Sequence, residues 1–183
     1  SARSVEVLIA ANADVRYRHC DGSTPLHRAA GNCSDKNTAA AMTTMLLAAK
    51  AEPTRTVERK TPLHIAAAQW NSTHAVKVLL DAKAITPCAL DEPSTPLHLA
   101  VASGDVATVE LLLAAGSDPN RRDEDGATPF HCASEVKSLG RGAVNKVDLL
   151  LRAKGDPNLT WSTLMAGDVT ALMAATMNGD THH

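Results

Sequence analysis

The sequence predicts an all-α fold built from repeated helical hairpins, and two observations carry that prediction. The intervals between the threonines of a recurring four-residue motif are 37, 34 and 33 residues, and such periods indicate stacked supersecondary units. The four copies are Thr24-Pro25-Leu26-His27, Thr61-Pro62-Leu63-His64, Thr95-Pro96-Leu97-His98 and Thr128-Pro129-Phe130-His131. Aromatic residues make up only 2% of the chain, whereas alanine and leucine, both strong helix formers, dominate its apolar residues. Thin helical layers therefore suit this composition better than a thick core.

The third copy of the motif opens a short helix followed by a longer one. Thr95 is suited to cap the first helix through its hydroxyl, Pro96 fits the first helical position, and Gly104 is expected to end the helix as a left-handed residue. Apolar residues then recur at helical spacing over 106–115, so a second, antiparallel helix is predicted. Residues 118–126 have the turn chemistry of a β-like hairpin leading to the next motif.

This third unit closely resembles an ankyrin repeat, and the four motifs extend the resemblance over nearly the whole chain. The resemblance implies an ankyrin-repeat solenoid of stacked helix-turn-helix units, joined by β-hairpin-like loops and forming a concave groove. It also implies that each motif histidine bonds its own threonine and adjacent backbone, tying one unit to the next. These residues are His27, His64, His98 and His131. A metal or catalytic site at His19-Cys20 or His131-Cys132 is the alternative, but no partner recurs at ligand spacing.

We interpret residues 1–183 as a single ankyrin-repeat domain. Its parts are a partial repeat 1–18, repeats at about 19–55, 56–89, 90–122 and 123–164, a partial repeat 165–181, and a possible tag remnant at 182–183. The half units at both ends lead us to expect a monomeric fragment of a longer array, because terminal units of a solenoid need a polar outer face. Extra residues around 33–37 and 138–144 predict protruding turns between helices, and others lengthen the last hairpin, 156–168.

Composition argues against several functional classes. The net charge of −2 supplies no positive field for nucleic acid, and no apolar stretch approaches the ~20 residues that a membrane span needs. The four cysteines lack CxxC spacing, and no signal peptide opens the chain, so we expect a reducing, cytoplasmic location. Phosphate-binding, zinc-protease and hydrolase motifs are missing from the sequence, so we expect no enzyme activity, cofactor or metal.

The resemblance also implies where a partner protein binds, because the family uses hairpin tips and the outer side of each first helix. The matching positions precede each motif threonine by one, three and four residues and follow it by seven and eight. Among them we select Asp21, Asn32, Glu58, Lys60, Gln69, Asp91, Glu92, Ser103, Glu124, Asp125 and Glu135. Carboxylates outnumber the single lysine, so we expect an acidic groove that steers a basic segment of a protein partner. The alternative interpretation is a solvated rim that keeps the chain soluble.

The two tryptophans are further candidates for partner binding, since tryptophan dominates interface hot spots. Trp70 stands where the family has the glycine that closes the first helix, so it either anchors a partner or packs beneath the turn 71–73. Trp161, on the lengthened hairpin, either anchors a partner or packs against the last unit. The sequence thus predicts a non-enzymatic protein-interaction scaffold. The alternative is the regulatory or targeting arm of a larger enzyme or channel.

Overall fold

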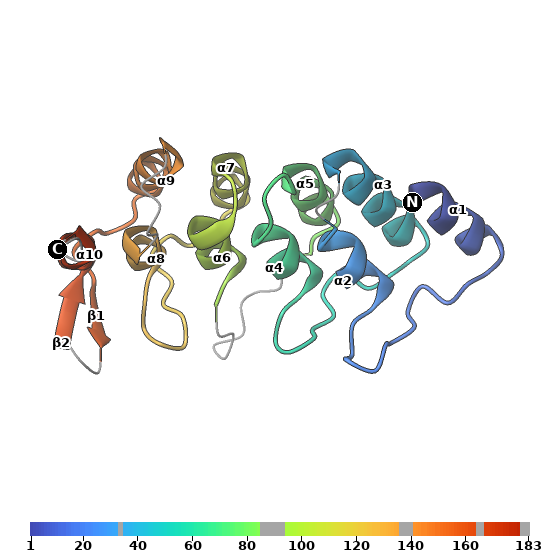
Figure 1. Cartoon of the computed structure of the whole chain (residues 1–183), viewed down its shortest axis with the longest axis horizontal. Coiled ribbons are helices and arrows are strands. Elements are labelled where there is room, and N and C mark those ends of the chain that lie inside the picture. Colours follow the sequence, from blue (N-terminus) through green and yellow to red (C-terminus); the bar gives the residue numbers. More distant parts are fainter. Residues whose placement is uncertain (33–34, 85–93, 136–140, 164–166, 180–183) are drawn as a thin grey trace. The chain divides into compact units, whose positions relative to one another are not determined.

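A computed structural model describes residues 1–32, 35–84, 94–135, 141–163 and 167–179. The chain divides into two compact units, Ser1–Leu90 and Asp91–His183, and each is described by itself (Figure 1). Unit 1 contains α1 (Ala2–Ala10), α2 (Pro25–Ala30), α3 (Lys36–Ala48), α4 (Pro62–Ala67) and α5 (Thr73–Asp81). Unit 2 contains α6 (Pro96–Ser103), α7 (Val106–Ala114), α8 (Pro129–Glu135), α9 (Arg141–Arg152), β1 (Thr160–Thr163), β2 (Gly167–Thr170) and α10 (Ala171–Gly179).

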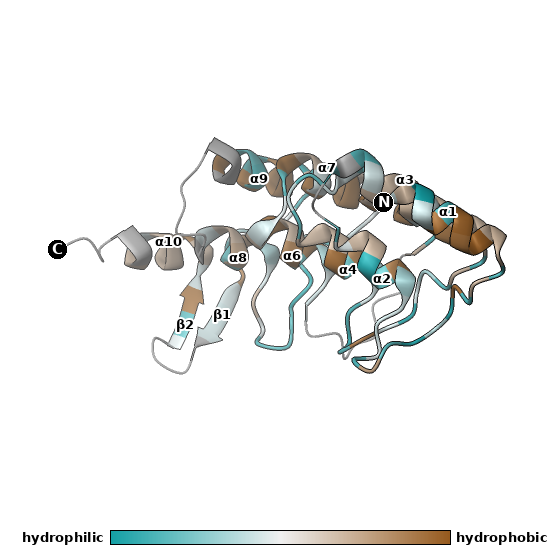
Figure 2. Ribbon diagram, turned by 45° about the vertical axis from the view of Figure 1, so that its right-hand side comes forward, coloured by the Kyte–Doolittle hydropathy of each residue, from teal (hydrophilic) through white to brown (hydrophobic). Residues whose placement is uncertain are grey.

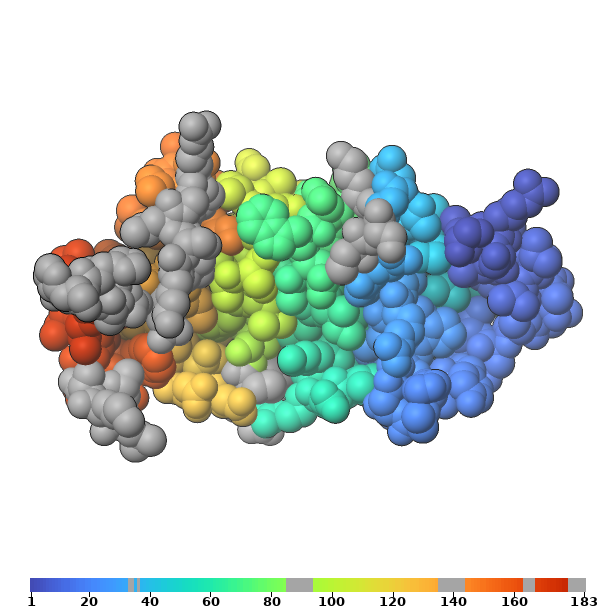
Figure 3. Space-filling view, in the orientation of Figure 1, coloured from blue at the N-terminus to red at the C-terminus, as the bar shows by residue number. Residues whose placement is uncertain are grey.

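Each unit has two rows of helices. In unit 1 the short helices α2 and α4 pack against each other, and each also packs on its own longer helix, α3 or α5. The longer helices α1, α3 and α5 form the second row. Unit 2 repeats this arrangement, with α6, α8 and α10 in one row and α7 and α9 in the other. The loops that precede α2, α4 and α8 extend from the open side of that row (Figures 1 and 3). The predicted repeat of hairpin, helix and helix is thus confirmed in both units.

The short helices begin as the motif predicts. Proline occupies the first turn, and the hydroxyls of Thr61 and Thr95 accept hydrogen bonds from the N–H groups of His64 and His98 at 3.4 and 3.5 Å. This bond satisfies one of the N–H groups that a helix start leaves without an intrahelical partner. The leucine after each proline then points into the space between the helix rows, where Leu63 and Leu97 are 1% and 0% exposed.

Three motif histidines, His27, His98 and His131, join neighbouring repeats, as the resemblance implied. Nδ1 of His27 accepts a hydrogen bond from the Thr24 backbone N–H at 3.3 Å, while Nε2 donates one to the Arg55 carbonyl at 3.1 Å. His98 and His131 make the same pair of contacts, reaching the carbonyls of Ala127 at 3.2 Å and Val169 at 3.1 Å. Because a carbonyl only accepts and the threonine N–H only donates, each ring is neutral with its proton on Nε2.

Two sequence predictions about helix ends are wrong. Gly104 is not left-handed: with φ −79° and ψ −178° it is extended, and its N–H still bonds the Ala100 carbonyl. The extended backbone leads directly into Asp105, whose carboxylate caps α7 by accepting the Thr108 N–H at 2.7 Å. The insertions are not wholly protruding turns either, because Lys36, Asn37 and residues 141–144 belong to α3 and α9. Asp35 caps α3 there, and the remaining insertion residues at 33–34 and 138–140 lie outside the described ranges.

The longer helices share one backbone feature at their ends. A residue with positive φ follows each of them, and it is glycine only after α7, at Gly116 with φ 89°. The others are Asn12 (60°), Lys50 (64°), Lys83 (55°) and Lys154 (63°). This left-handed residue turns the chain out of the helix toward the next loop.

The loop before α10 forms a two-stranded antiparallel sheet, which is the one sheet within the described residues. β1 pairs with β2, so that Trp161 lies opposite Val169 and Ser162 opposite Asp168. The Val169 carbonyl at the end of this ladder is the one that His131 bonds, which fixes the hairpin to α8. Residues 164–166 of the predicted long hairpin lie outside the described residues.

Candidate functional site

A hollow of about 400 Å³ lies in unit 1, between the loops that precede α2 and α4 and the exposed sides of these helices. We call it the unit 1 hollow. It is lined by Asp21, Ser23, His27, Arg28, Gly31, Val57, Glu58, Ile65 and Gln69. Two carboxylates and one guanidinium supply its charges, and Val57 and Ile65 supply apolar surface. This mixture suits a peptide segment with both charged and apolar side chains.

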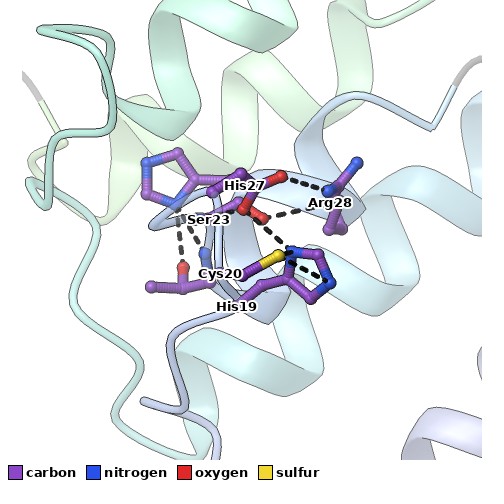
Figure 4. A network of polar contacts seen from close by, with 7 residues as sticks. His19, Cys20, Ser23, His27 and Arg28 are labelled. Carbon is purple, nitrogen blue, oxygen red and sulfur yellow. Dashed lines mark hydrogen bonds and ion pairs between the residues drawn. The ribbon is translucent and has the colours of Figure 1, made fainter.

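One wall of the hollow is a polar network at the loop before α2 (Figure 4). Asp21 accepts a hydrogen bond from the Ser23 N–H at 2.8 Å and pairs with the Arg28 guanidinium, which also donates to the Ser23 hydroxyl at 3.1 Å. His19 Nδ1 lies 3.1 Å from the same carboxylate. The hydrogen bonds from Ser23, with smaller contributions from His19 and Arg28, hold the pKa of Asp21 well below its usual range. Asp21 is therefore ionised over the whole neutral range.

The opposite wall is a tight turn before α4. Val57 and Lys60 exchange two backbone hydrogen bonds of 2.9 Å, and the central residues Glu58 and Arg59 have φ of 49° and 62°. Positive φ at both central residues defines a type I′ turn, which closes a two-residue hairpin. This turn places Glu58 at the tip, where it lines the hollow and is exposed to solvent.

The structure brings three predicted site residues together, because Asp21, Glu58 and Gln69 line the hollow from two successive repeats. Lys60 is exposed at the end of the second turn but does not line the hollow. Asn32 lines a different, apolar groove beside α1. The sequence therefore grouped five residues of unit 1, but the structure places three of them in the hollow and the other two, Asn32 and Lys60, elsewhere.

Trp70 lies in the turn that joins α4 to α5, and 68% of its surface is exposed. The interpretation that it packs beneath residues 71–73 is therefore wrong. Asn71 takes positive φ, and the Ser72 hydroxyl donates hydrogen bonds to the carbonyls of Ala66 and Gln69, so the turn closes without the indole. An exposed tryptophan next to Gln69 remains as a candidate anchor for a partner.

Sequence reasoning missed two residues that line the hollow, Arg28 and Ile65. Both follow their motif threonine by four residues, one helical turn before the predicted Asn32 and Gln69. Residues four apart share a helix face, so extending the predicted positions by one turn would have found them.

In unit 2 the predicted residues lie on separate loops and helices. Glu124 and Asp125 are exposed in the turn before α8, where the Asp123 carboxylate accepts the N–H groups of Asp125 at 3.1 Å and Ala127 at 2.8 Å. Ser103 ends α6, and its hydroxyl donates to the Leu99 carbonyl. Asp91 and Glu92 lie outside the described residues, as does the side chain of Glu135 at the end of α8.

Trp161 packs within unit 2. Its indole N–H donates to the Asp125 carbonyl at 2.8 Å, and its ring lies edge-on to His131 with 5.8 Å between centroids. Arg122 strengthens the same junction by donating to the carbonyls of Gly126 and Thr160. These contacts support the packing interpretation of Trp161 rather than that of a partner anchor.

The described residues offer little for metal or redox chemistry. Within them, no group of three or more His, Cys, Asp or Glu side chains is arranged to hold a metal ion. Cys20 approaches His19 Nδ1 at 3.4 Å, but the Asp21 carboxylate takes up the hydrogen bond of that nitrogen. None of the described helices is both long and apolar enough to cross a membrane.

Comparison with known proteins gives a family match and two relatives. The family described as ankyrin repeats (3 copies) matches residues 1–91, 32–123 and 67–161. The chain is 35% identical over 111 residues to the E3 ubiquitin-protein ligase KEG of Arabidopsis thaliana, which covers 60% of this chain and 7% of that protein. It is 54% identical over 35 residues to a putative ankyrin repeat protein of Pyrobaculum aerophilum, covering 19% and 14% of the two chains. The aligned segments thus span less than a sixth of either relative.

Proposed function

The chain belongs to the ankyrin repeat family, and from this premise we propose that it is a non-enzymatic interaction module that binds a partner protein through its loop tips and short helices. The observation that carries the proposal is the unit 1 hollow. Six of its lining residues occupy the positions that the family uses for binding: Asp21, Ser23, Gly31, Val57, Glu58 and Gln69. The buried faces of the same helices maintain the fold, so their outer faces are available for a ligand.

We propose further that the partner presents a basic segment with at least one apolar side chain. The Arg28 guanidinium already pairs with Asp21, and Lys60 lies outside the lining, so the second carboxylate, Glu58, leaves the hollow acidic. Charge of this kind raises association rates and selects among partners more than it raises affinity. Trp70, beside Gln69, would add an aromatic anchor, because large exposed indoles gain most from being covered.

We propose a cytoplasmic location for this module. The four cysteines are spread over separate repeats without CxxC spacing, which suits reduced thiols, and Cys20 carries an exposed thiol.

A second candidate function is the regulatory or targeting arm of a larger enzyme or channel. One observation favours it: the segment similar to this chain makes up only 7% of a ubiquitin ligase. In that arrangement the hollow would select the substrate or regulator, while the chemistry would belong to another domain.

The binding proposal is tested with a peptide array that holds matched basic, neutral and acidic segments, each with and without apolar residues. We expect the chain to retain basic segments and to lose them as salt is raised. Calorimetry on the best peptide then compares Glu58→Gln and Trp70→Ala with the control Glu6→Gln, an exposed carboxylate on α1 outside the hollow. We expect each site variant to weaken binding by about threefold to tenfold, and the control to leave it unchanged. Equal affinity of all four proteins for the chosen peptide, or a preference of the wild type for acidic segments, would contradict the proposal.

A further inference from the structure

Arg28 of α2 lines the unit 1 hollow, and one end of its guanidinium is fixed. Nε donates a hydrogen bond to the Ser23 hydroxyl at 3.1 Å, and Nη2 donates one to the Asp21 carboxylate (Figure 4). The loop before α2 fixes that carboxylate in turn, because Asp21 also accepts the Ser23 N–H at 2.8 Å. Within the described residues, the Nη1 end of Arg28 makes no hydrogen bond. Arg28 therefore has a set orientation and N–H groups that a ligand can use.

The charges around Arg28 decide which kind of acceptor suits it. Asp21 is ionised over the neutral range and neutralises the guanidinium, and Glu58 on the opposite wall adds a second carboxylate. An anionic ligand group would therefore meet more negative than positive charge in the hollow. A neutral carbonyl oxygen avoids that repulsion and still gains from a charged donor, which forms stronger hydrogen bonds than a neutral one. Every peptide bond supplies such an oxygen.

Gly31 leaves room for a main chain beside Arg28. It ends α2 three residues after Arg28, so the two residues lie on the same face of the helix. Its φ of −84° is open to any residue, so the backbone conformation does not require glycine there. A Cβ on Gly31 would instead lie 3.0 Å from Cγ2 of Ile65, so a side chain would crowd the floor of the hollow. The bare backbone allows another chain to approach closely.

The opposite wall suits a basic side chain. Glu58 is exposed at the tip of the turn before α4 and makes no ion pair or hydrogen bond within the described residues. Its basic neighbours Arg59 and Lys60 do not line the hollow. Val57 and Ile65 are half-buried and supply apolar surface for the methylene stem of a lysine or arginine. Figure 2 shows mostly hydrophilic residues along the loops before α2 and α4, so this apolar surface is local.

We propose that the unit 1 hollow binds an extended segment of a partner protein, with a main-chain carbonyl on Arg28 and a lysine or arginine side chain on Glu58. This inference rests on the proposed function and adds which wall holds the main chain of the partner and which holds its side chain. The segment is extended, because carbonyls inside a helix are already hydrogen-bonded within that helix. Arg28 thus sets where the main chain lies, and Asp21 positions Arg28.

Calorimetry with one peptide tests the role of Arg28. The peptide is the tightest basic ligand from the array that has no acidic residue, and its C-terminus is amidated, so no carboxylate can reach Arg28. Arg28→Lys keeps the charge but loses the planar fork of donors, so we expect it to weaken binding by about threefold to tenfold. Arg152→Lys is the matched control, because Arg152 is similarly exposed and pairs with Asp148 at 2.8 Å on α9 in unit 2. It should bind like the wild type.

Changes in the peptide then identify the groups that the two walls hold. Replacing one amide at a time by an ester weakens the carbonyl as an acceptor, and at one position this should weaken binding to the wild type by several fold. The same ester should matter less to Arg28→Lys, since residues in contact show coupled effects. Replacing the basic residue of the peptide by norleucine should remove the effect of Glu58→Gln but preserve that of Arg28→Lys.

The outcomes separate this inference from the proposed function. A wild type that does not prefer basic peptides would overturn both. If that preference holds but a folded Arg28→Lys variant binds as well as the wild type, or more tightly, only the inference is overturned, because Arg28 then competes with the peptide's cation or does not contact the peptide. Equal ester effects in both proteins would also overturn it. Circular dichroism checks that Arg28→Lys and Glu58→Gln retain their helices.

Discussion

The motif histidines show how one residue links local and distant structure. His98 is 1% exposed, accepts from the Thr95 N–H three residues earlier, and donates to the Ala127 carbonyl 29 residues later. A second proton on the ring would have to sit on Nδ1, where the threonine N–H already points. Burial also penalises the charged form, which lowers the pKa of both His27 and His98 below the ordinary 6.5.

We expect the free energy of unfolding to fall as the pH drops from 7.5 to 5.5. At pH 7.5 both the folded and the unfolded chain carry mostly neutral His27 and His98, so these two groups contribute little pH dependence there. Below 6.5 the unfolded chain binds protons that the folded chain does not, and each group then removes up to about 1.4 kcal/mol per pH unit. Urea unfolding at several pH values measures this slope.

The double variant His27→Asn/His98→Asn provides the control for this slope. It should be less stable at every pH but should lose less stability on acidification. Asp21 does not contribute over this interval, because its pKa lies well below its usual range. A pH-independent wild type, or an unchanged slope in the variant, would show that other groups control the titration.

At the scale of elements, the fourth repeat combines two substitutions that compensate each other. Phe130 stands where the other motifs have leucine, and Gly155 follows α9 where the other long helices are followed by Ala13, Ala51, Ala84 or Ser117. A Cβ on Gly155 would lie 2.5 Å from Cε2 of Phe130 and 2.9 Å from the Leu150 carbonyl. The larger ring therefore fits because the facing residue has no side chain.

We expect Gly155→Ala to destabilise the chain by roughly 1–3 kcal/mol through overpacking against Phe130. Phe130→Leu should also destabilise it, by the loss of buried area, but the double variant should be more stable than the sum of the two changes predicts. Chemical denaturation of the four proteins gives the coupling free energy. Additive effects would show that Gly155 and Phe130 are not coupled.

A buried lysine joins two helices of unit 2. Lys146 of α9 is 7% exposed, and its ammonium donates a hydrogen bond of 2.8 Å to the Val101 carbonyl near the end of α6. Burial lowers the pKa of Lys146, with Asp105 opposing that effect. The positive charge lies near the carbonyl end of α6, which favours cations.

We expect Lys146→Ala to cost roughly 1–3 kcal/mol of unfolding free energy, because it leaves the Val101 carbonyl without this donor and removes a packed stem. Lys146→Met keeps most of the stem and should recover part of the loss. Lys77→Ala on the exposed side of α5 is the control and should change stability by less than about 0.5 kcal/mol. A loss in the control as large as that at Lys146 would point to general effects of removing a lysine.

The sequence predicted those elements whose signals lie within a few residues of each other. The threonine cap, the proline of the first turn and the helical spacing of apolar residues gave the short and long helices of each repeat. It did not predict that Gly104 is extended, because the Asp105 cap of the next helix decides that conformation. Nor did it decide the role of Trp161, whose hydrogen bond reaches Asp125, 36 residues earlier.

The whole molecule consists of two compact units, and its candidate site is less predictable than its fold. Family positions located Asp21, Glu58 and Gln69, but the hollow that joins them depends on the type I′ turn at Glu58 and on the pairing of Arg28 with Asp21. The turn and the ion pair depend on the conformation of a loop and of two side chains. The repeat period does not determine either conformation. Repeat proteins also distribute stability over neighbouring units, so a local change has a local effect.

We expect Leu97→Ala to cost about 2–5 kcal/mol locally, since Leu97 is fully buried, and to accelerate amide exchange mainly in α6 to α9. Exchange in α1 to α3 should change little. Leu63→Ala should show the opposite distribution, and Leu151→Ala, at a half-exposed site, should leave exchange near that of the wild type. Hydrogen exchange with mass spectrometry resolves these segments. Uniform acceleration in both leucine variants would show that the chain unfolds as one cooperative body.

The lysines that follow α3, α5 and α9 with positive φ have a practical consequence. Replacing Lys50, Lys83 or Lys154 by glycine relieves left-handed strain of about 1–2 kcal/mol at each site. The same change destabilises the folded state by about 0.4–1 kcal/mol, because glycine gives the unfolded chain more conformational entropy. It also removes a cation at the helix C-terminus, which contributes about 0.3–1 kcal/mol. These contributions nearly cancel, which agrees with glycine occupying the same place at Gly116. Three such exchanges would take the formal charge from −2 to −5 and lower the isoelectric point, leaving every packed face untouched.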